Sequence, residues 1–327
     1  MKKKITLALT LALVTIFTSC SNPKIEFRKN CLNGNTEKIY AFLDKFAQEN
    51  NFDNKNQEEK NEILKEYFTL ENKESETYDK ILRKHFSKNK IKKDINNICI
   101  DPLSAVVISN NLDLIKYMID YGFLDTIGGL ITSCILNNQE IALYLIETSE
   151  NLHSAALSAI LENDNVTLFK KCTEYFDMTN ARITADNPLI YASRTNAINC
   201  VKYMVENDIY KINEYNYYYE TPLSVANNKE LITYLKEKNG QTISNSIQAE
   251  VKKLKDITKK LLYNSENPPS EYEALQLIEE YKYTIKEATQ TIKRTKDITS
   301  LELDLILEGL SESYDAFQEL GKLAYYY

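Results

Sequence analysis

The sequence predicts an all-α protein, in which a solenoid of stacked helix–turn–helix repeats precedes a C-terminal helical bundle. The first observation is an internal repeat within residues 187–237. A proline-opened helix, a tight turn and a second amphipathic helix occur there twice, with Pro188 and Pro222 spaced 34 residues apart. A repeat of this period indicates a solenoid, because no single unit buries its apolar side alone. The second observation is composition: only 7 Gly and 6 Pro among 327 residues argue against a turn-rich β-sandwich. The third is a change of hydrophobic period after Gly240.

Residues 1–19 are predicted to be a cleaved signal peptide. Three lysines precede the apolar run Ile5–Phe17, which is too short to be a good membrane span and ends in Phe17-Thr18-Ser19-Cys20. This ending resembles the bacterial lipoprotein signal, in which a small residue precedes a cysteine that becomes lipid-modified, although Phe17 replaces the usual Leu. The resemblance implies that Cys20 carries the lipid and that residues 20–24 form a polar tether. The alternative is an ordinary secretory peptide that ends in a chance cysteine.

The charge balance bears on location and partners. A net charge of −7 and a pI near 5.2 argue against nucleic-acid binding, which needs a basic face. Removing residues 1–19 takes away three lysines and no acidic residue, so the mature chain is more acidic still. The membrane contact is therefore expected through lipidated Cys20, at the bacterial cell envelope, with inner and outer membrane left undecided.

Five cysteines remain besides Cys20: Cys31, Cys99, Cys134, Cys172 and Cys200. Five cannot all pair within one chain, and no CxxC or Cys/His cluster predicts a metal site or a cofactor. The last three fall at apolar repeat positions, where a thiol behaves as a small hydrophobe. A disulfide between Cys31 and Cys99 stays open.

The solenoid is predicted over residues 25–240, with its first unit near the start. Within 25–46, two short helical phrases flank Gly34-Asn35, and the outer side is polar, as a capping repeat requires. The next segment, about 47–100, is rich in Lys, Glu and Asn and is read as an insertion of one or two amphipathic helices. Its composition predicts partial disorder from residue 50 to residue 59.

From Asp101-Pro102-Leu103-Ser104-Ala105 the repeats resume. The equivalent positions of the second helices are 27, 27, 32 and 31 residues apart: Leu114, Ile141, Leu168, Cys200 and Leu231. The two short spacings predict that most of the extended finger between those units is missing. Asn110, Asn137 and Asp164 stand at the inter-helix turns where Gly is usual, and Asn and Asp are the residues that best tolerate a left-handed backbone there.

Thr221-Pro222-Leu223, Ala226 and Val201-Lys202-Tyr203-Met204 resemble the ankyrin repeat, whose period is about 33 residues. The resemblance covers residues 101–240 and, with fewer matching positions, 25–46, for six units in all. The array is degenerate, since no Thr-Pro-Leu-His phrase is complete: its His place holds Ser104, Ile190 and Ser224. The resemblance implies a helical solenoid that binds proteins along its concave side, which finger tips and first helices form.

Residues 241–327 are predicted to form a three-helix bundle. Ser270 and Glu273 make a capping box after Asn267-Pro268-Pro269. The apolar positions expected to face the bundle core are Ile247, Val251, Leu254, Ile257, Leu261, then Leu275, Ile278, Tyr281, Ile285, Ala288, then Leu303, Ile306, Leu310, Tyr314 and Phe317. Three adjoining amphipathic helices satisfy one another, which favours a bundle over a zipper with a partner.

The sequence contains no catalytic signature. Its histidines, His85 and His153, fall in unrelated segments, and no HExxH, GxSxG, P-loop or GxGxxG phrase is present. The prediction is that the chain is not an enzyme. A cryptic hydrolase that uses two carboxylates is the least favoured alternative.

Tyr215, Tyr217, Tyr218 and Tyr219 are the candidate partner-binding residues. They fall on the predicted finger at residues 211–220, and exposed tyrosine offers a large contact area at a low entropy cost. The alternative is that two of the four pack on neighbouring repeats or on the bundle. The favoured function is a membrane-tethered scaffold that binds an unknown protein; the alternative is an inhibitor or immunity-type protein that blocks a secreted enzyme.

Overall fold

The computed structural model describes residues 22–93, 95–267 and 269–323. These residues form helices and no strand, which confirms the predicted all-α class. The chain divides into two compact units between Ile183 and Thr184. The sequence placed its boundary after residue 240, whereas the last two helix pairs share a unit with the C-terminal helices. The predicted signal peptide and Cys20 lie outside the described residues.

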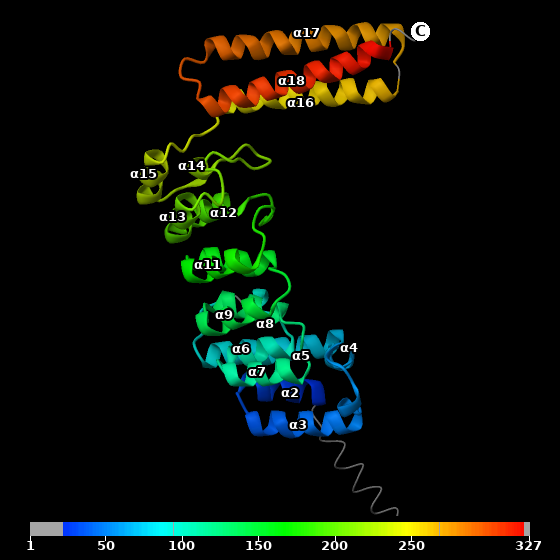
Figure 1. Ribbon diagram of the computed structural model, residues 1–327, viewed down its shortest axis with the longest axis vertical. Coiled ribbons are helices and arrows are strands. Elements are labelled where there is room, and N and C mark those ends of the chain that lie inside the picture. The colour runs from blue at the N-terminus through cyan, green and yellow to red at the C-terminus, as the bar shows by residue number, and fades with distance from the viewer. Residues whose placement is uncertain (1–21, 94, 268, 324–327) are drawn as a thin grey trace, which may run out of the picture. The chain divides into compact units, whose positions relative to one another are not determined.

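The first unit contains four helix pairs, whose first helices α2, α6, α8 and α10 contact one another in succession (Figure 1). The pairs are α2 (Pro23–Leu32) and α3 (Thr36–Glu49), α6 (Pro102–Ile108) and α7 (Leu112–Tyr121), α8 (Ile127–Leu136) and α9 (Gln139–Thr148), α10 (Ser154–Glu162) and α11 (Val166–Tyr175). The second-helix positions Leu114, Ile141 and Leu168 are at most 1% exposed, as predicted. Neighbouring pairs therefore share one core.

The inter-helix turns use Asn and Asp in the predicted way. The φ angles of Asn110, Asn137 and Asp164 are 58°, 55° and 48°, in the left-handed region that most side chains avoid. The turns are also linked between pairs, because Asn165 Nδ2 donates to Asn137 Oδ1 at 2.7 Å and Asn138 Nδ2 donates to Asn110 Oδ1. Side chains of the turns thus cap their own helices and connect adjacent units.

Helix α2 begins at Pro23, inside the segment 20–24 that was predicted to be a tether. Pro23 and Lys24 form its first turn, and the Asn22 side chain caps the helix by accepting from the Lys24 N–H at 2.9 Å. Proline suits this place because its missing N–H has no partner in a first turn anyway. The predicted tether of residues 20–24 is therefore too long at its C-terminal end.

The insertion is folded throughout the segment where disorder was predicted. It comprises η1 (Phe52–Asn54), α4 (Gln57–Phe68), α5 (Asn72–Lys88) and η2 (Ile95–Asn97). Phe52 is only 4% exposed, and an Asn56–Glu59 capping box starts α4. The prediction of disorder was wrong because the segment, although mostly polar, contributes aromatic residues to a packed cluster. This cluster joins the insertion to the first helix pairs and consists of Phe27, Phe42, Phe46, Phe52, Tyr67, Phe68, Tyr121 and Phe123.

The second unit begins with two further pairs, α12 (Pro188–Thr195) with α13 (Ile198–Glu206) and α14 (Pro222–Val225) with α15 (Lys229–Glu237). Pro188 and Pro222 open their helices, as the repeat predicts, and Cys200 and Leu231 are fully buried. The link from α13 to α14 is long and holds the predicted finger. The link from α9 to α10, in one of the short units, runs only from residue 149 to residue 153 and is too short to form a finger.

Three long helices complete the second unit: α16 (Asn245–Glu266), α17 (Glu271–Arg294) and α18 (Ser300–Leu323). Helix α16 packs against both others, and its five predicted core residues are all buried. The Ser270–Glu273 capping box is present. The predicted faces of α17 and α18 are confirmed at most positions, and the exceptions are Leu275 and Tyr314, which are 58% and 54% exposed.

The cause of the difference in α18 is close helix packing. A Cβ added at Gly309 would lie 3.1 Å from Leu254 Cδ1, so α18 approaches α16 through its small residues. Gly309, Ser313 and Ala316 face the core together with Leu305 and Ile306. A pattern that counts only large apolar residues misses such a face.

The described cysteines are all free, including Cys31 and Cys99, so the disulfide left open by the sequence is not formed. Four of them, Cys31, Cys134, Cys172 and Cys200, are buried, and burial raises the pKa of Cys172 to about 12. Such thiols are poor nucleophiles. Within the described ranges, no helix combines the length and the apolar character needed to cross a bilayer.

Candidate functional site

The finger at residues 211–220 is a short hairpin between α13 and α14. The Tyr219 N–H donates to the Asn216 carbonyl at 3.0 Å, and the Asn216 N–H donates to the Glu220 carbonyl at 3.0 Å. Tyr217 and Tyr218 occupy the two central positions of the turn. Tyr219 follows with a φ of 60°, the left-handed place of a bulged hairpin that usually takes Gly. The hairpin therefore presents two tyrosines at its tip.

Asn216 shapes this tip from inside. Its side chain is 6% exposed, and its Oδ1 accepts from the N–H groups of Tyr218 and Glu220 at 2.9 and 3.0 Å. Its Nδ2 donates to Asp186 Oδ1 at 2.6 Å and to Glu220 Oε2 at 2.8 Å. All four hydrogen bonds hold the turn in one conformation, as asparagine commonly does in loops.

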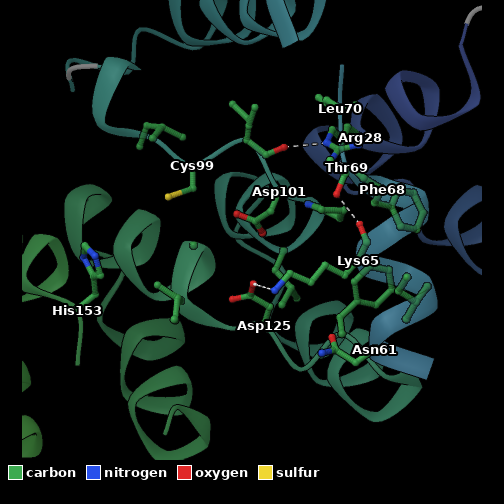
Figure 2. Close-up of a pocket in the computed structure, with 18 residues that line it drawn as sticks. Arg28, Asn61, Lys65, Phe68, Thr69, Leu70, Cys99, Asp101, Asp125 and His153 are labelled. Atoms are coloured by element: carbon green, nitrogen blue, oxygen red, sulfur yellow. Dashed lines mark hydrogen bonds and ion pairs between the residues drawn. The ribbon is translucent and has the colours of Figure 1, made fainter. Parts of the chain in front are cut away.

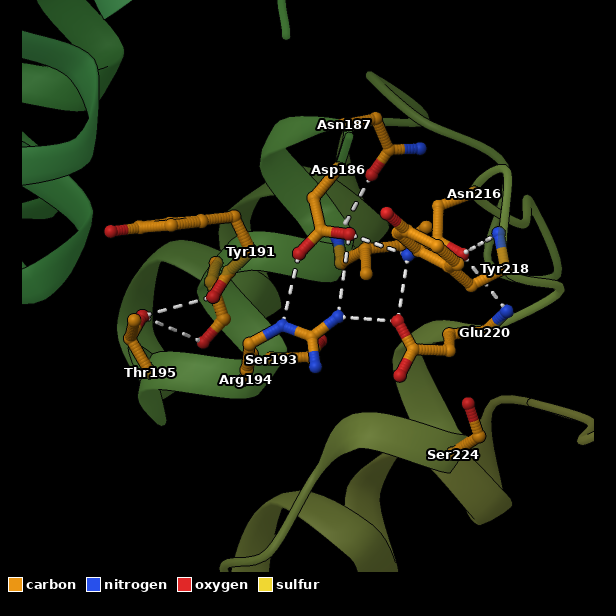
Figure 3. A network of polar contacts seen from close by, with 12 residues as sticks. Asp186, Asn187, Tyr191, Ser193, Arg194, Thr195, Asn216, Tyr218, Glu220 and Ser224 are labelled. Carbon is orange, nitrogen blue, oxygen red and sulfur yellow. Dashed lines mark hydrogen bonds and ion pairs between the residues drawn. The ribbon is translucent and has the colours of Figure 1, made fainter. Parts of the chain in front are cut away.

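Arg194 of α12 joins the finger to the helix pair beneath it (Figure 3). Its Nη2 donates to Glu220 Oε2 at 2.7 Å, and its Nε donates to Asp186 Oδ2 at 3.0 Å. The carboxylates of Glu220 and Asp186 raise the pKa of Arg194, and Arg194 with Asn216 lowers the pKa of Glu220. A charge-assisted network of this kind fixes the base of the finger.

Tyr217 and Tyr218 project from the finger into solvent. They are 83% and 61% exposed, the first of them being more exposed than any other large apolar or aromatic side chain recorded in the described residues. Their rings contact each other edge to face, with centroids 5.5 Å apart and planes at 83°. Neither ring is needed to fill the core.

Tyr215 and Tyr219 pack against the C-terminal helices, which is the alternative that the sequence left open for two of the four tyrosines. They stack on each other with ring centroids 5.9 Å apart, and they pack against the core that α16 and α18 share. Lys255 Nζ lies 5.3 Å from the centre of the Tyr219 ring. These contacts compensate the left-handed backbone at Tyr219, which is unfavourable for a bulky residue. The exposed part of the predicted site is therefore Tyr217 with Tyr218.

The two histidines lie in separate elements, α5 and the N-terminal cap of α10. His153 accepts the Ala155 N–H at its Nδ1 and caps α10. His85 belongs to α5, and partial burial lowers its pKa. No group of three or more His, Cys, Asp or Glu side chains that suits a metal ion occurs within the described residues.

A second candidate site was missed by sequence reasoning. A pocket of about 790 Å³ lies in the first unit, between the insertion and the adjoining helix pairs. Its lining comes from several separate segments, including α2, α4 and the residues around Asp101. No local pattern brings such segments together, and the Asp101 phrase indicated only the start of a helix.

Comparison with known proteins gives no relative: no family model, no curated protein and no solved structure matches the chain significantly. Function is therefore inferred from the geometry of the residues themselves. Two features carry that inference, the fixed finger with its exposed tyrosines and the pocket of the first unit.

Proposed function

We propose that the chain is a lipid-anchored binding protein of the bacterial cell envelope, similar to ankyrin-repeat proteins, and that it captures a protein partner through Tyr217 and Tyr218. One observation carries the proposal: two highly exposed tyrosines stand at the tip of a finger whose backbone is fixed from beneath. The stack of helix pairs and the Thr221-Pro222-Leu223 phrase support the likeness to ankyrin repeats.

Tyrosine at such a place is suited to recognition. Binding energy at protein interfaces concentrates in a few aromatic or Arg anchors, and Tyr supplies contact area while losing only two rotatable bonds. A finger that is already ordered avoids the entropy cost of being fixed on binding. The Asn216 and Arg194 networks supply that order.

The membrane part of the proposal is supported by the N-terminal sequence, which resembles a lipoprotein signal ending at Cys20. Changing Cys20→Ala is expected to leave an unprocessed or soluble exported protein. Fractionation and detergent partitioning that do not change with this substitution would refute the anchor and leave the finger unaffected.

The finger is tested by capture of the partner from solubilised envelope, with the Cys20→Ser chain as bait. Tyr217→Ala combined with Tyr218→Ala should weaken capture by about thirtyfold or more, since each anchor is worth about 1–2 kcal/mol. The melting temperature should stay unchanged, because both rings are exposed.

A matched control is available on α17, where Tyr272 and Tyr283 are 70% and 64% exposed. Their double change to Ala removes a similar amount of exposed tyrosine and should leave capture intact. Changes at Lys236 and Glu237 should also leave it intact. If the finger variant still captures its partner, or if the α17 variant loses it equally, the finger is not the binding site.

A further inference from the structure

The pocket of the first unit has the size of a ligand site. Its volume of about 790 Å³ falls within the range of about 300–1,000 Å³ that is usual for small-molecule pockets. Figure 2 shows its lining, which includes Arg28 of α2, Lys65 and Phe68 of α4, and Asp101 before α6. All these residues belong to one compact unit.

Apolar side chains make up most of the lining. Leu64, Phe68, Ile98, Leu103 and Phe123 are each at most 7% exposed and close the inner side. Ile100 and Ile127 also line the pocket, yet they are 38% and 40% exposed. The pocket thus offers apolar surface to an occupant from its interior to its outer edge.

The charged groups of the lining already have protein partners. Arg28 donates to the carbonyls of Ile100 at 2.8 Å, Phe68 at 2.6 Å and Lys24 at 3.3 Å. Asp101 accepts from the Ser104 N–H at 2.9 Å and from the Ser104 hydroxyl.

At the outer edge, Lys65 and Asp125 form an ion pair at 3.9 Å. Arg28 and Asp101 thus have protein partners, and Lys65 and Asp125 are 69% and 52% exposed to solvent, so the lining favours an apolar ligand.

The start of the described chain lies beside this pocket. Lys24, in the first turn of α2, donates from its Nζ to the carbonyl of the lining residue Thr69 at 3.0 Å. Cys20 precedes the cap residue Asn22 by two positions, and two extended residues span at most about 7 Å. A chain attached to Cys20 therefore begins within about 7 Å of Asn22, which caps the helix that carries Lys24.

We propose that this pocket binds a hydrocarbon chain and that its occupant is an acyl group on lipidated Cys20. This inference rests on the proposed lipidation of Cys20. It states in addition where the lipid goes, because an acyl chain that is bound in the pocket is withdrawn from the bilayer. Because a single acyl chain gives only marginal membrane binding, attachment becomes reversible when this withdrawal leaves one chain in the bilayer.

The affinity of the pocket for hydrocarbon is tested on a Cys20→Ser chain that lacks residues 1–19, because it carries neither lipid nor the apolar signal segment and its pocket is empty on this account. The apolar fluorescent probe N-phenyl-1-naphthylamine should bind saturably at one site. Ile127→Asn should weaken this binding at least fivefold. Leu124→Asn is the matched control, because Leu124 is also 40% exposed and does not line the pocket. No saturable binding, or an equal loss in both variants, would overturn the proposal.

The source of the occupant is tested by hydrogen exchange on the full lipidated protein in vesicles, compared with the Cys20→Ser chain. Amides of residues 64–70 and 98–103 should exchange more slowly in the lipidated protein, while those of α9 should not change. If mass spectrometry finds lipid on Cys20 but exchange is unaltered, the pocket does not hold that lipid. If no lipid is found on Cys20, both the anchor and this inference fail.

Discussion

Single residues determine the turns of this protein. The sequence predicts the conformation of some of these residues and not of others. Asn110, Asn137 and Asp164 take left-handed conformations as predicted, because the short polar side chains of Asn and Asp tolerate them. Tyr219 takes the same conformation at the finger, and nothing local predicts it. Its backbone is stabilised by packing against residues of the bundle, which are remote in the sequence.

A testable case at this scale is Asn196, at the turn between α12 and α13. Its φ is 61°, and its Oδ1 is buried without a hydrogen-bond partner among the described residues. Asn196→Gly should raise the free energy of unfolding by about 1 kcal/mol, because Gly removes both the backbone strain and the unsatisfied oxygen. Asn196→Ala keeps the strain and should not stabilise. Denaturant unfolding of both variants checks this, and a stabilised Ala variant would contradict it.

At the scale of elements, helix pairs were predicted well and contacts between distant segments were not. The 3/4 spacing of α16 identified its buried face, because large apolar residues mark it. In α18 the spacing identified Ile306, Leu310 and Phe317, but it missed Gly309, through which the helix approaches Leu254 closely. The sequence also did not predict that Arg28 joins separate segments, because the carbonyls that accept its hydrogen bonds belong to Phe68 and Ile100, which are distant in the sequence.

Arg28 should be one of the most sensitive positions of the first unit. Arg28→Met removes the donor for three backbone carbonyls and should lower the free energy of unfolding by about 3 kcal/mol. Arg83→Met is the control: the Arg83 side chain is 51% exposed and pairs with Asp79, so its loss should cost less than about 1 kcal/mol. Equal costs in denaturant unfolding would show that Arg28 does not join these segments.

The base of the finger should respond to acid. Arg194, then Asn216, holds the pKa of Glu220 below its ordinary value. Such a carboxylate stabilises the fold above its unfolded pKa of about 4.3, and the contribution is lost as pH falls through the lower folded pKa.

Glu220→Gln should therefore cost up to about 1 kcal/mol at neutral pH, since the ion pair is partly exposed. The difference between wild type and variant should vanish once Glu220 is protonated. Unfolding curves measured from neutral to acidic pH check this prediction, and a difference that persists in acid would contradict it.

At the scale of the whole molecule, the compact units separate within the run of helix pairs. The sequence placed the boundary after residue 240, where the hydrophobic period changes. The long helices begin there, with α16 at Asn245, while the compact units separate at residues 183 and 184, and Tyr215 and Tyr219 pack on the core of the C-terminal helices. A change of period marks a change of architecture, but it carries no information about which neighbouring elements pack together.

Because neighbouring pairs share a core, one truncation should weaken several helices at once. Leu114 is fully buried, so Leu114→Ala should cost about 2–5 kcal/mol and speed amide exchange in α6 to α9. Leu124→Ala, at a side chain 40% exposed, should cost less than about 1 kcal/mol. Exchange that rises in α7 alone would mean that the pairs do not stabilise one another.

The most direct test of the proposed function is site-specific photocross-linking in living cells. Tyr217 is replaced by the photoreactive residue p-benzoylphenylalanine, and Tyr272, which is 70% exposed on α17, is replaced in a parallel strain. Irradiation should give one discrete adduct with a protein partner from position 217 and none from position 272. No adduct from position 217, or the same adducts from both positions, would contradict the claim that the finger is the binding site.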